Sequence, residues 1–178
     1  SFPTRRSSDL ACGAHVAVLD LKYSSAEKVA NDIQAEGGSA IGLSANVLER
    51  DSLEQARAVI AEKWGGCDIL INGAGGNHPK GTTSKEWLEK EDVLNADPTI
   101  TTFFDLDPQG IEFVFNLNFL GTLLPSQVFA KDMIDRKGAT IINISSMNAF
   151  TPLTKIPAYS AAKAAVSNFT QWLAVHLS

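Results

Sequence analysis

The sequence predicts an α/β fold built on a doubly wound parallel sheet. Short apolar runs typical of buried strands alternate with longer amphipathic segments typical of helices along most of the 178 residues. This alternation indicates parallel strands that are covered by helices on both faces. Polar residues or a glycine-rich turn follow the strand-like runs, and in such sheets ligands bind beyond the carboxyl ends of the strands.

The first part of the chain reads as two strand–helix units followed by a third strand. Serines and acids that favour helix starts precede the helical segments, and glycine pairs follow them. The expected elements are a strand at 14–20, a helix from Ser24 or Ser25 to about Glu36, a strand at 39–45, a helix from Asp51 or Ser52 to Gly65-Gly66, and a strand at 67–71.

The second part begins with a turn and a long polar stretch. The turn is Asn72-Gly73-Ala74-Gly75-Gly76, and the polar stretch runs from Asn77 to about Pro108. Long loops in compact domains are often binding loops, so this stretch is a candidate for ligand contacts. A helix at about 109–136, a strand at 139–145 and a helix from about 158 are expected to follow.

Composition narrows the possible functions. The formal charge of −5 argues against a broad nucleic-acid surface. No apolar run approaches the ~20 residues that span a bilayer, so a membrane is not expected as a partner either. Cys12 and Cys67 lack the spacing of a redox or metal motif, which favours free thiols and a cytoplasmic protein. His15, His78 and His176 are scattered, so no metal site is expected.

The two ends of the chain do not read like domain boundaries. Residues 1–10 resemble the in-frame translation of a common sequencing-library adapter, and such segments are excluded from fold reasoning. A natural disordered arm is the alternative. At the other end, the chain stops at Ser178 within an apolar helical pattern that no Gly or Pro closes. We therefore expect an artefact at 1–10 and one domain at 11–178 that is truncated at both ends.

Three side chains suggest chemistry at a carbonyl group. Tyr159 and Lys163 stand four residues apart in a segment of good helix formers, so their side chains should share one face. Ser146 follows the apolar run at 140–145. A free tyrosine has a pKa of about 10, and a neighbouring ammonium favours the phenolate and lowers that pKa. A proton donor, a cation beside it and a hydroxyl that can bond an oxyanion suit hydride transfer to or from a carbonyl.

Four motifs together resemble the short-chain dehydrogenase/reductase family over almost all of 11–178. They are Asn72-Gly73-Ala74-Gly75, Asn118 within 115–121, Ile142-Asn143-Ile144-Ser145-Ser146, and Tyr159-x-x-x-Lys163. The resemblance implies a Rossmann-like fold, a partial dinucleotide-binding oxidoreductase domain, and a homodimer or homotetramer formed through helices near 110–130 and 158–178. It also implies a catalytic tetrad: Tyr159 as acid or base, Lys163 lowering its pKa, Ser146 binding the substrate oxygen, and Asn118 holding a water in a proton relay.

The resemblance implies NAD as the cofactor. Asp20 ends the first strand-like run, where a carboxylate can bond both ribose hydroxyls and repel a 2′-phosphate; Lys22 keeps NADP as the less favoured alternative. The other expected cofactor contacts are Asn46, Val47, Asn72, Gly73, Ala74, Tyr159 and Lys163. The chain departs from the family in three ways: Asn46 replaces an acid, Gly73 replaces an Asn, and the Gly-rich turn that holds the pyrophosphate is missing.

Polar side chains in two loops suggest a polar, anionic substrate. Asn77 and His78 follow the glycine-rich turn, and Asn148 and Lys155 follow Ser146. These loops are similar to those of the bacterial D-mannonate oxidoreductases (fructuronate reductases) within the family. That similarity implies interconversion of fructuronate and mannonate, so the expected partner is a small keto or hydroxy sugar acid.

Other functions stay open. Another sugar or polyol dehydrogenase, or a 3-oxoacyl-carrier-protein reductase, would use the same tetrad. A protein of a different class, either a non-catalytic fragment or a nucleotide-binding regulatory relative, stays open because the phosphate-binding turn is missing. For the same reason we expect residues 1–178 alone to show weak or no dehydrogenase activity.

Overall fold

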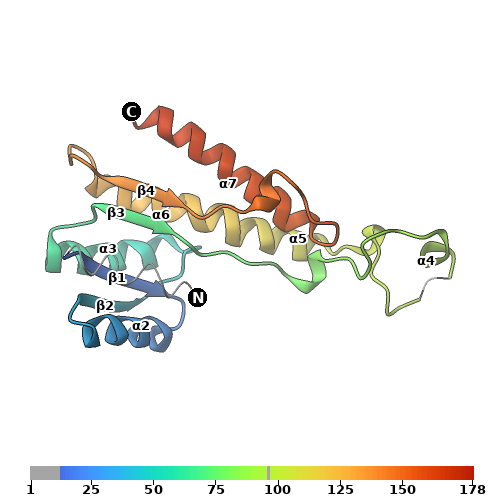
Figure 1. The fold of residues 1–178 in the computed structure, drawn as a ribbon, viewed down its shortest axis with the longest axis horizontal. Coiled ribbons are helices and arrows are strands. Elements are labelled where there is room, and N and C mark those ends of the chain that lie inside the picture. The colour runs from blue at the N-terminus through green and yellow to red at the C-terminus, as the bar shows by residue number, and fades with distance from the viewer. Residues whose placement is uncertain (1–12, 96) are drawn as a thin grey trace. The chain divides into compact units, whose positions relative to one another are not determined.

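The structure is a computed structural model that describes residues 13–95 and 97–178. Within these ranges, helices alternate with parallel strands, so the expected α/β class is confirmed (Figure 1). The chain divides into two compact units. The first runs to Leu70 and also contains Gln127–Thr140, and the second comprises Ile71–Ser126 and Ile141–Ser178. The expectation that residues 1–10 are an artefact lies outside the described residues.

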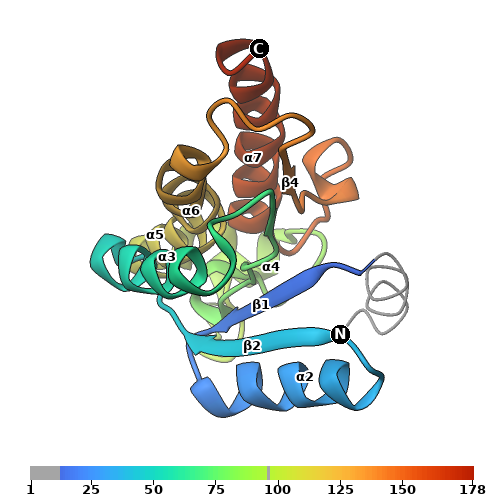
Figure 2. The same ribbon diagram turned by 90° about the vertical axis from the view of Figure 1, so that its left-hand side faces the viewer.

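The first unit is built from two strand–helix pairs. Its elements are β1 (His15–Asp20), α2 (Tyr23–Ala35), β2 (Ser39–Ser44) and α3 (Arg50–Trp64). β1 and β2 pair in parallel, with Val16 opposite Ala40. α2 covers one face of this pair, where Ala30, Ile33 and Ala40 form the centre of a small apolar core (Figure 2).

The start of α2 differs from the expectation. The helix begins at Tyr23, and its cap residue is Lys22, which makes no side-chain capping bond. The backbone N–H of Lys22 donates to Oδ1 of Asp20 at 2.8 Å, so the turn after β1 leads directly into the helix. Ser24 and Ser25 therefore lie inside the first turn, and the prediction that one of them caps the helix was wrong.

The start of α3 also differs, whereas its end agrees. The helix begins at Arg50, and Ser52 accepts a hydrogen bond from the backbone N–H of Asn46 at 2.9 Å. That bond closes the turn between β2 and α3. Gly65 follows the helix with a φ of 82°, a left-handed conformation that glycine adopts at low cost, so the expected stop is confirmed.

β3 (Ile69–Asn72) and β4 (Thr140–Asn143) form a second ladder. The N–H of Thr140 donates to the carbonyl of Asp68, and the N–H of Ile144 donates to the carbonyl of Asn72. Because the partners advance in the same direction, the two strands are parallel. Their carboxyl ends therefore lie side by side.

The apolar segment expected as one helix at 109–136 is helical but interrupted. It consists of α5 (Pro108–Phe115), a π-helical turn (Asn116–Leu120), α6 (Gly121–Phe129) and a 3-10 turn (Ala130–Asp132). π turns are rare inside helices and are frequent at functional sites. The sequence pattern did not distinguish this turn from regular α-helix.

By length and composition, Pro108–Asp132 could cross a membrane. It spans 25 residues with a mean hydropathy of 1.3, contrary to the expectation that no such run exists. Core helices of globular proteins meet the same criterion. Asn118, Thr122 and Ser126 lie on this helix, and all three are buried and hydrogen-bonded within the second unit. We therefore interpret the segment as a core helix.

The polar stretch after the glycine-rich turn has internal structure. It contains 3-10 turns at Pro79–Gly81 and Phe103–Asp105 and the short helix α4 (Lys90–Leu94). Lys85 pairs with Glu89 at 2.8 Å and with Asp92 at 2.7 Å. The ammonium of Lys85 lowers the pKa of the Asp92 carboxyl. These bonds order a segment that its composition alone suggested was an open loop.

α7 (Pro157–His176) follows a 3-10 turn at Met147–Ala149. Pro157 stands in its first turn, where the missing N–H of proline costs nothing. Val114 of α5 packs with Ala158 and Ala162 of α7 in a buried cluster. This packing fixes how α7 is rotated about its own axis.

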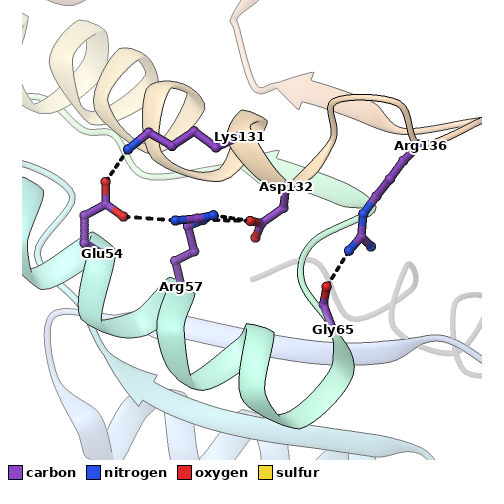
Figure 3. Close-up of polar contacts among 6 residues, drawn as sticks. All are labelled: Glu54, Arg57, Gly65, Lys131, Asp132 and Arg136. Carbon is purple, nitrogen blue, oxygen red and sulfur yellow. Dashed lines mark hydrogen bonds and ion pairs between the residues drawn. The ribbon is translucent and has the colours of Figure 1, made fainter.

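A network of charges joins α3 to the segment after α6 within the first unit (Figure 3). Arg57 donates from Nε to Oδ1 of Asp132 at 2.8 Å, and a second bond from Nη2 reaches the same oxygen. Glu54 accepts from Arg57 at 3.3 Å and from Lys131 at 2.7 Å. The side chain of Asp132 is only 7% exposed. The negative charge of Asp132 is therefore compensated mainly by the guanidinium of Arg57 and less by water.

Replacing Arg57 with Met should lower the free energy of unfolding by about 3–5 kcal/mol, because it leaves the buried carboxylate of Asp132 without its cation. Lys131→Gln is the matched control, since its ion pair with Glu54 is more exposed and should contribute less than about 1 kcal/mol. Urea unfolding followed by circular dichroism measures both changes. Equal losses in the two variants would contradict this account.

Candidate active site

Tyr159 and Lys163 lie on the same face of α7. Nζ of Lys163 is 5.8 Å from the centroid of the Tyr159 ring. The alanines around them favour helix, and the cluster of Ala158 and Ala162 holds the neighbouring face of the helix against α5. The four-residue spacing thus becomes a phenol and an ammonium on one side of a packed helix.

The Lys163 side chain is buried, with 4% of the residue exposed. Its Nζ donates to the carbonyl oxygen of Ile144 at 2.7 Å. Burial lowers the pKa of Lys163, because the charged form loses solvation by water. The carbonyl bond holds the amino group at the carboxyl end of β4.

Ser145 fixes the end of β4 against α7. Its hydroxyl donates to the carbonyl of Lys163 at 3.1 Å and bonds the hydroxyl of Ser167 at 2.6 Å. Ser146 comes next, and its Oγ accepts from the N–H of Asn148 at 3.2 Å. The Ser146 hydroxyl acts there as acceptor only, so its proton can be donated to a substrate oxygen.

Asn118 is fully buried in the π turn and makes three side-chain hydrogen bonds. Nδ2 donates to the carbonyls of Gly76 and Val114, each at 2.7 Å, and Oδ1 accepts from the N–H of Gly76 at 3.3 Å. One amide proton therefore holds the glycine-rich turn, and the other bonds the carbonyl of Val114 in α5. One lone pair of Oδ1 is the remaining hydrogen-bonding capacity of this side chain, which limits how it could bind the water of a relay.

Gly75 lies against both Asn118 and Lys163. A Cβ placed on Gly75 would be 2.6 Å from Oδ1 of Asn118 and 3.2 Å from Nζ of Lys163. Glycine is required here because no side chain fits between these two atoms. The structure thus brings together Asn118, Lys163 and Tyr159 around the turn that follows β3, with Ser146 at the end of the neighbouring strand.

The cofactor residues predicted in the first unit make local bonds. The Asp20 side chain is exposed, and one of its oxygens accepts from the N–H of Lys22. The Asn46 side chain donates to Glu49 at 2.8 Å and accepts from the N–H of Leu48 at 3.0 Å. Asn46 therefore closes the turn before α3 with both ends of its amide, and Val47 beside it is half-buried.

The cofactor residues predicted in the glycine-rich turn differ from one another. Asn72 is buried, and its Nδ2 donates to Ser126 at 2.9 Å and to Asn143 at 2.8 Å. Its side chain is therefore directed into the protein and does not face a ligand. Around Gly73 the nearest atom to an added Cβ is 4.0 Å away, on Ile144, so this position has free space. Ala74 is half-buried.

The substrate residues predicted after the turn also bond locally. Asn77 donates to the hydroxyl of Thr82 at 2.8 Å. Nδ1 of His78 accepts from the N–H of Lys80 at 3.2 Å, and its ring lies 5.1 Å from that of Phe113. These contacts shape the loop, and they leave Nε2 of His78 as the atom that could meet a ligand.

The second predicted substrate loop is tied to the first. The N–H of Thr83 donates to the carbonyl of Lys155 at 3.0 Å. Asn148 is buried, with 7% exposed, in the 3-10 turn directly after Ser146. The structure therefore brings the two loops together, although among the described residues these side chains make no hydrogen bond to Asn118, Ser146, Tyr159 or Lys163.

Four buried or half-buried polar residues were missed by sequence reasoning: Thr122, Ser126, Asn143 and Thr170. Ser126 donates to the carbonyl of Thr122, and Asn143 donates to the hydroxyl of Thr170. Asn72 donates to both Ser126 and Asn143, and all of these bonds lie in the interior of the second unit. A signal was present in the four-residue spacing of Asn118, Thr122 and Ser126, which places all three on one helical face.

Gly75→Ala should lower the free energy of unfolding by about 1–3 kcal/mol, because the added methyl group overpacks the contact with Asn118 and Lys163. Asn118 cannot move aside without losing its three bonds. Gly73→Ala is the control, since the space around Gly73 is open and the change should be small. Thermal melts of both variants test this, and a loss at Gly73 that equals the loss at Gly75 would rule out the overpacking explanation.

Comparison with known proteins places the chain in a family. A family model described as short chain dehydrogenase matches residues 9–178. An uncharacterized oxidoreductase of Haemophilus influenzae is 61% identical over 165 residues, which cover 93% of this chain and 56% of the relative. An uncharacterized oxidoreductase UxuB of Bacillus subtilis is 45% identical and covers 93% of this chain and 58% of the relative. The chain thus spans just over half the length of these relatives.

A solved structure agrees with the sequence relatives. The crystal structure of a Haemophilus influenzae protein, provisionally described as a D-mannonate oxidoreductase and solved with bound NAD, matches with a TM-score of 0.89 and 59% identity. The match covers 94% of this chain and 58% of that one, which confirms the Rossmann-like fold. With the family model matched from residue 9 to residue 178, this chain belongs to the short-chain dehydrogenase family.

Proposed function

We propose that the protein is an NAD-dependent oxidoreductase that interconverts a ketone and a secondary alcohol on a sugar acid, with fructuronate and mannonate as the pair. Membership of the short-chain dehydrogenase family supports the reaction class. The provisional description of the Haemophilus influenzae structure supports the substrate. Because the chain covers 58% of that structure, the proposal concerns the whole protein.

The observation that carries the proposal is the arrangement of Lys163 and Tyr159 beside the end of β4. Lys163 is buried, bonded to the carbonyl of Ile144, and 5.8 Å from the centroid of the Tyr159 ring. In this proposal the ammonium of Lys163 stabilises the charge that remains on the Tyr159 oxygen when Tyr159 gives up its proton. A purely structural lysine would not need burial next to a tyrosine.

Each residue of the tetrad has a distinct proposed role in reduction. NADH, when bound, supplies the hydride that adds to the carbonyl carbon. As the carbonyl π bond breaks, Ser146 donates a hydrogen bond to the oxygen and stabilises its growing charge. Tyr159 gives its hydroxyl proton to that oxygen and becomes a phenolate, which the ammonium of Lys163 stabilises. Oxidation of the alcohol runs through the same steps in reverse.

The proposed role of Asn118 follows from its bonds. Its amide holds the main chain of Gly76 and thereby shapes the turn next to Lys163. The remaining lone pair of its Oδ1 can bond a water that passes a proton toward Lys163. In this proposal the main role of Asn118 is to hold the main chain of the turn, and its second role is to bind the water that transfers a proton.

The residues of this chain fit NAD at two places. Asp20 is exposed at the end of β1, where its carboxylate could accept from ribose hydroxyls and would repel a 2′-phosphate. Gly73 and Gly75 expose main chain without side chains, and a Cβ on Gly75 would fill the space next to Lys163. Lys22 keeps NADP as the less favoured alternative. Asn46, whose amide is used in the turn before α3, is proposed to contact the cofactor through its main chain only.

An anionic sugar acid suits the polar loops. Lys155 supplies a cation that forms no ion pair with the described residues, and the tie from Thr83 to its carbonyl fixes the loop that carries it. His78, Asn77 and Asn148 could supply hydrogen bonds to hydroxyl groups. A 3-oxoacyl thioester would instead need an apolar channel, and because the loop after Ser146 also exposes Met147 and Phe150, the substrate screen below decides between the two substrates.

The proposal extends to assembly and location. α7 exposes large apolar side chains, with Trp172 at 55% and Val175 at 77% exposure. Apolar residues at this density on one helix suit a protein interface. We propose a homodimer or homotetramer in the cytoplasm that acts on small molecules.

A screen of NADH oxidation by the whole protein tests the proposed function. Fructuronate should be reduced at least 10-fold more efficiently than neutral keto-sugars, because the cation of Lys155 favours an acid. Acetoacetyl thioesters should not be turned over. Residues 1–178 alone serve as the matching control and should show little activity. Turnover of thioesters but of no keto-acid sugar would overturn the proposed substrate.

Tyr159→Phe should lower kcat by about 10²–10⁴-fold, because it removes the proton that the substrate oxygen receives. The chain offers a matched control in its other tyrosine: Tyr23 is 53% exposed and bonds Glu27. Tyr23→Phe should leave kcat within twofold of the parent. Near-normal turnover by Tyr159→Phe in a folded protein would remove this residue from the mechanism.

A further inference from the structure

The carbonyl of Asn118 accepts a hydrogen bond from a side chain. In the π turn Asn116–Leu120 the main-chain bonds shift, and the N–H of Gly121 reaches back to the carbonyl of Asn116. The carbonyl of Asn118 accepts from the hydroxyl of Thr122 at 2.9 Å. A side chain thus bonds the main chain of this turn at the position that carries Asn118.

Thr122 begins a line of bonds through the interior of the second unit. The hydroxyl of Ser126 donates to the carbonyl of Thr122 at 2.7 Å, and Asn72 donates to Ser126 at 2.9 Å. Asn72 also donates to Asn143 at 2.8 Å. Thr122 is 1% exposed, Ser126 is 3% exposed and Asn72 is 5% exposed. The line therefore lies away from water and connects β3 and β4 to the π turn.

The direction of these bonds is consistent along the line. Thr122 and Ser126 each donate their hydroxyl proton to the carbonyl four residues earlier in the helix. The proton of Ser126 is therefore in use, and its oxygen accepts the bond from Asn72. Removing one donor would leave a buried polar atom without a partner, which is unfavourable. The network therefore has one favourable pattern of donors and acceptors. In that pattern the hydroxyl of Thr122 holds the carbonyl of Asn118 in place.

We propose that Thr122 is a positioning residue for the active site: its hydroxyl bond to the Asn118 carbonyl holds the π turn in the form that places the Asn118 amide against Gly76. Asn118 in turn lies within contact of Gly75, whose other neighbour is Lys163. The effect of Thr122 on turnover rests on the proposed function. Its effect on the geometry of Gly76 does not.

The first test compares variants of Thr122 in the whole protein. Thr122→Val keeps the shape and removes the hydroxyl, whereas Thr122→Ser keeps the hydroxyl. We expect Thr122→Val to lower kcat at least 10-fold with KM within twofold, and Thr122→Ser to restore kcat to within threefold of the parent. Thr140→Val is the control, because the Thr140 hydroxyl also donates to a main-chain carbonyl, that of Gly138 at 3.1 Å, but on the surface and outside this line of bonds. It should leave kcat within twofold.

The second test needs no catalysis. The N–H of Gly76 donates to Oδ1 of Asn118, so its hydrogen exchange reports the position of that amide. Exchange at Gly76 should rise at least 10-fold in Thr122→Val and remain near the parent rate in Thr122→Ser and Thr140→Val. Exchange at Gly81, which bonds His78, should not change.

The outcomes separate the inference from the proposed function. Faster exchange at Gly76 with no turnover by the parent protein on any substrate would support the positioning role and refute the proposed function. Unchanged exchange at Gly76 in Thr122→Val would overturn the inference whatever the activity. If Thr122→Val does not fold, the pair Thr122→Ala and Thr122→Ser isolates the hydroxyl, and equal exchange and equal kcat in that pair would overturn it as well.

Discussion

A buried amino group bonded to a main-chain carbonyl organises the second unit. Lys163 donates to Ile144 at 2.7 Å while only 4% of the residue is exposed. Removing an ammonium from water is costly, and the bond to a carbonyl offsets part of that cost. The same bond joins α7 to the end of β4, so the position of Tyr159 on α7 depends on it. A lowered pKa for Lys163 is the consequence of this burial.

Other features of the unit follow from the need to keep that amino group in place. Gly75 has no side chain because Lys163 and Asn118 occupy the space next to it. Ser145 bonds the main chain of Lys163, which prevents α7 from sliding along β4. A buried polar network is stabilising only when every member is satisfied, and along the line from Asn72 to Asn118 each amide or hydroxyl that donates has an acceptor. The polar network specifies a single geometry for the unit. An apolar core in its place could pack more tightly.

The strands and most helices could be predicted from the sequence because hydrophobic periodicity depends on burial, and burial decides where these elements form. The start of α2 could not, because the N–H of Lys22 bonds Asp20 and the helix begins before the serines that composition favours as caps. The π turn was not predictable either, since it depends on how Asn118 and Thr122 bond in three dimensions. The motif residues of the site were found by spacing, whereas the directions of their side chains were not.

The polar residues of the motifs fall into two physical groups, and the distinction bears on which of them act on a ligand. Asn46, Asn72 and Asn77 use their amides in bonds to neighbouring protein groups. Such a side chain can serve a cofactor or substrate only with the amide protons and lone pairs that these bonds leave over. Ser146 and Asp20 keep bonding capacity free, because Ser146 accepts without donating and Asp20 is exposed with one oxygen engaged. A motif therefore identifies positions, and the hydrogen bonds that remain unmade identify which side chains at those positions are free to do chemistry.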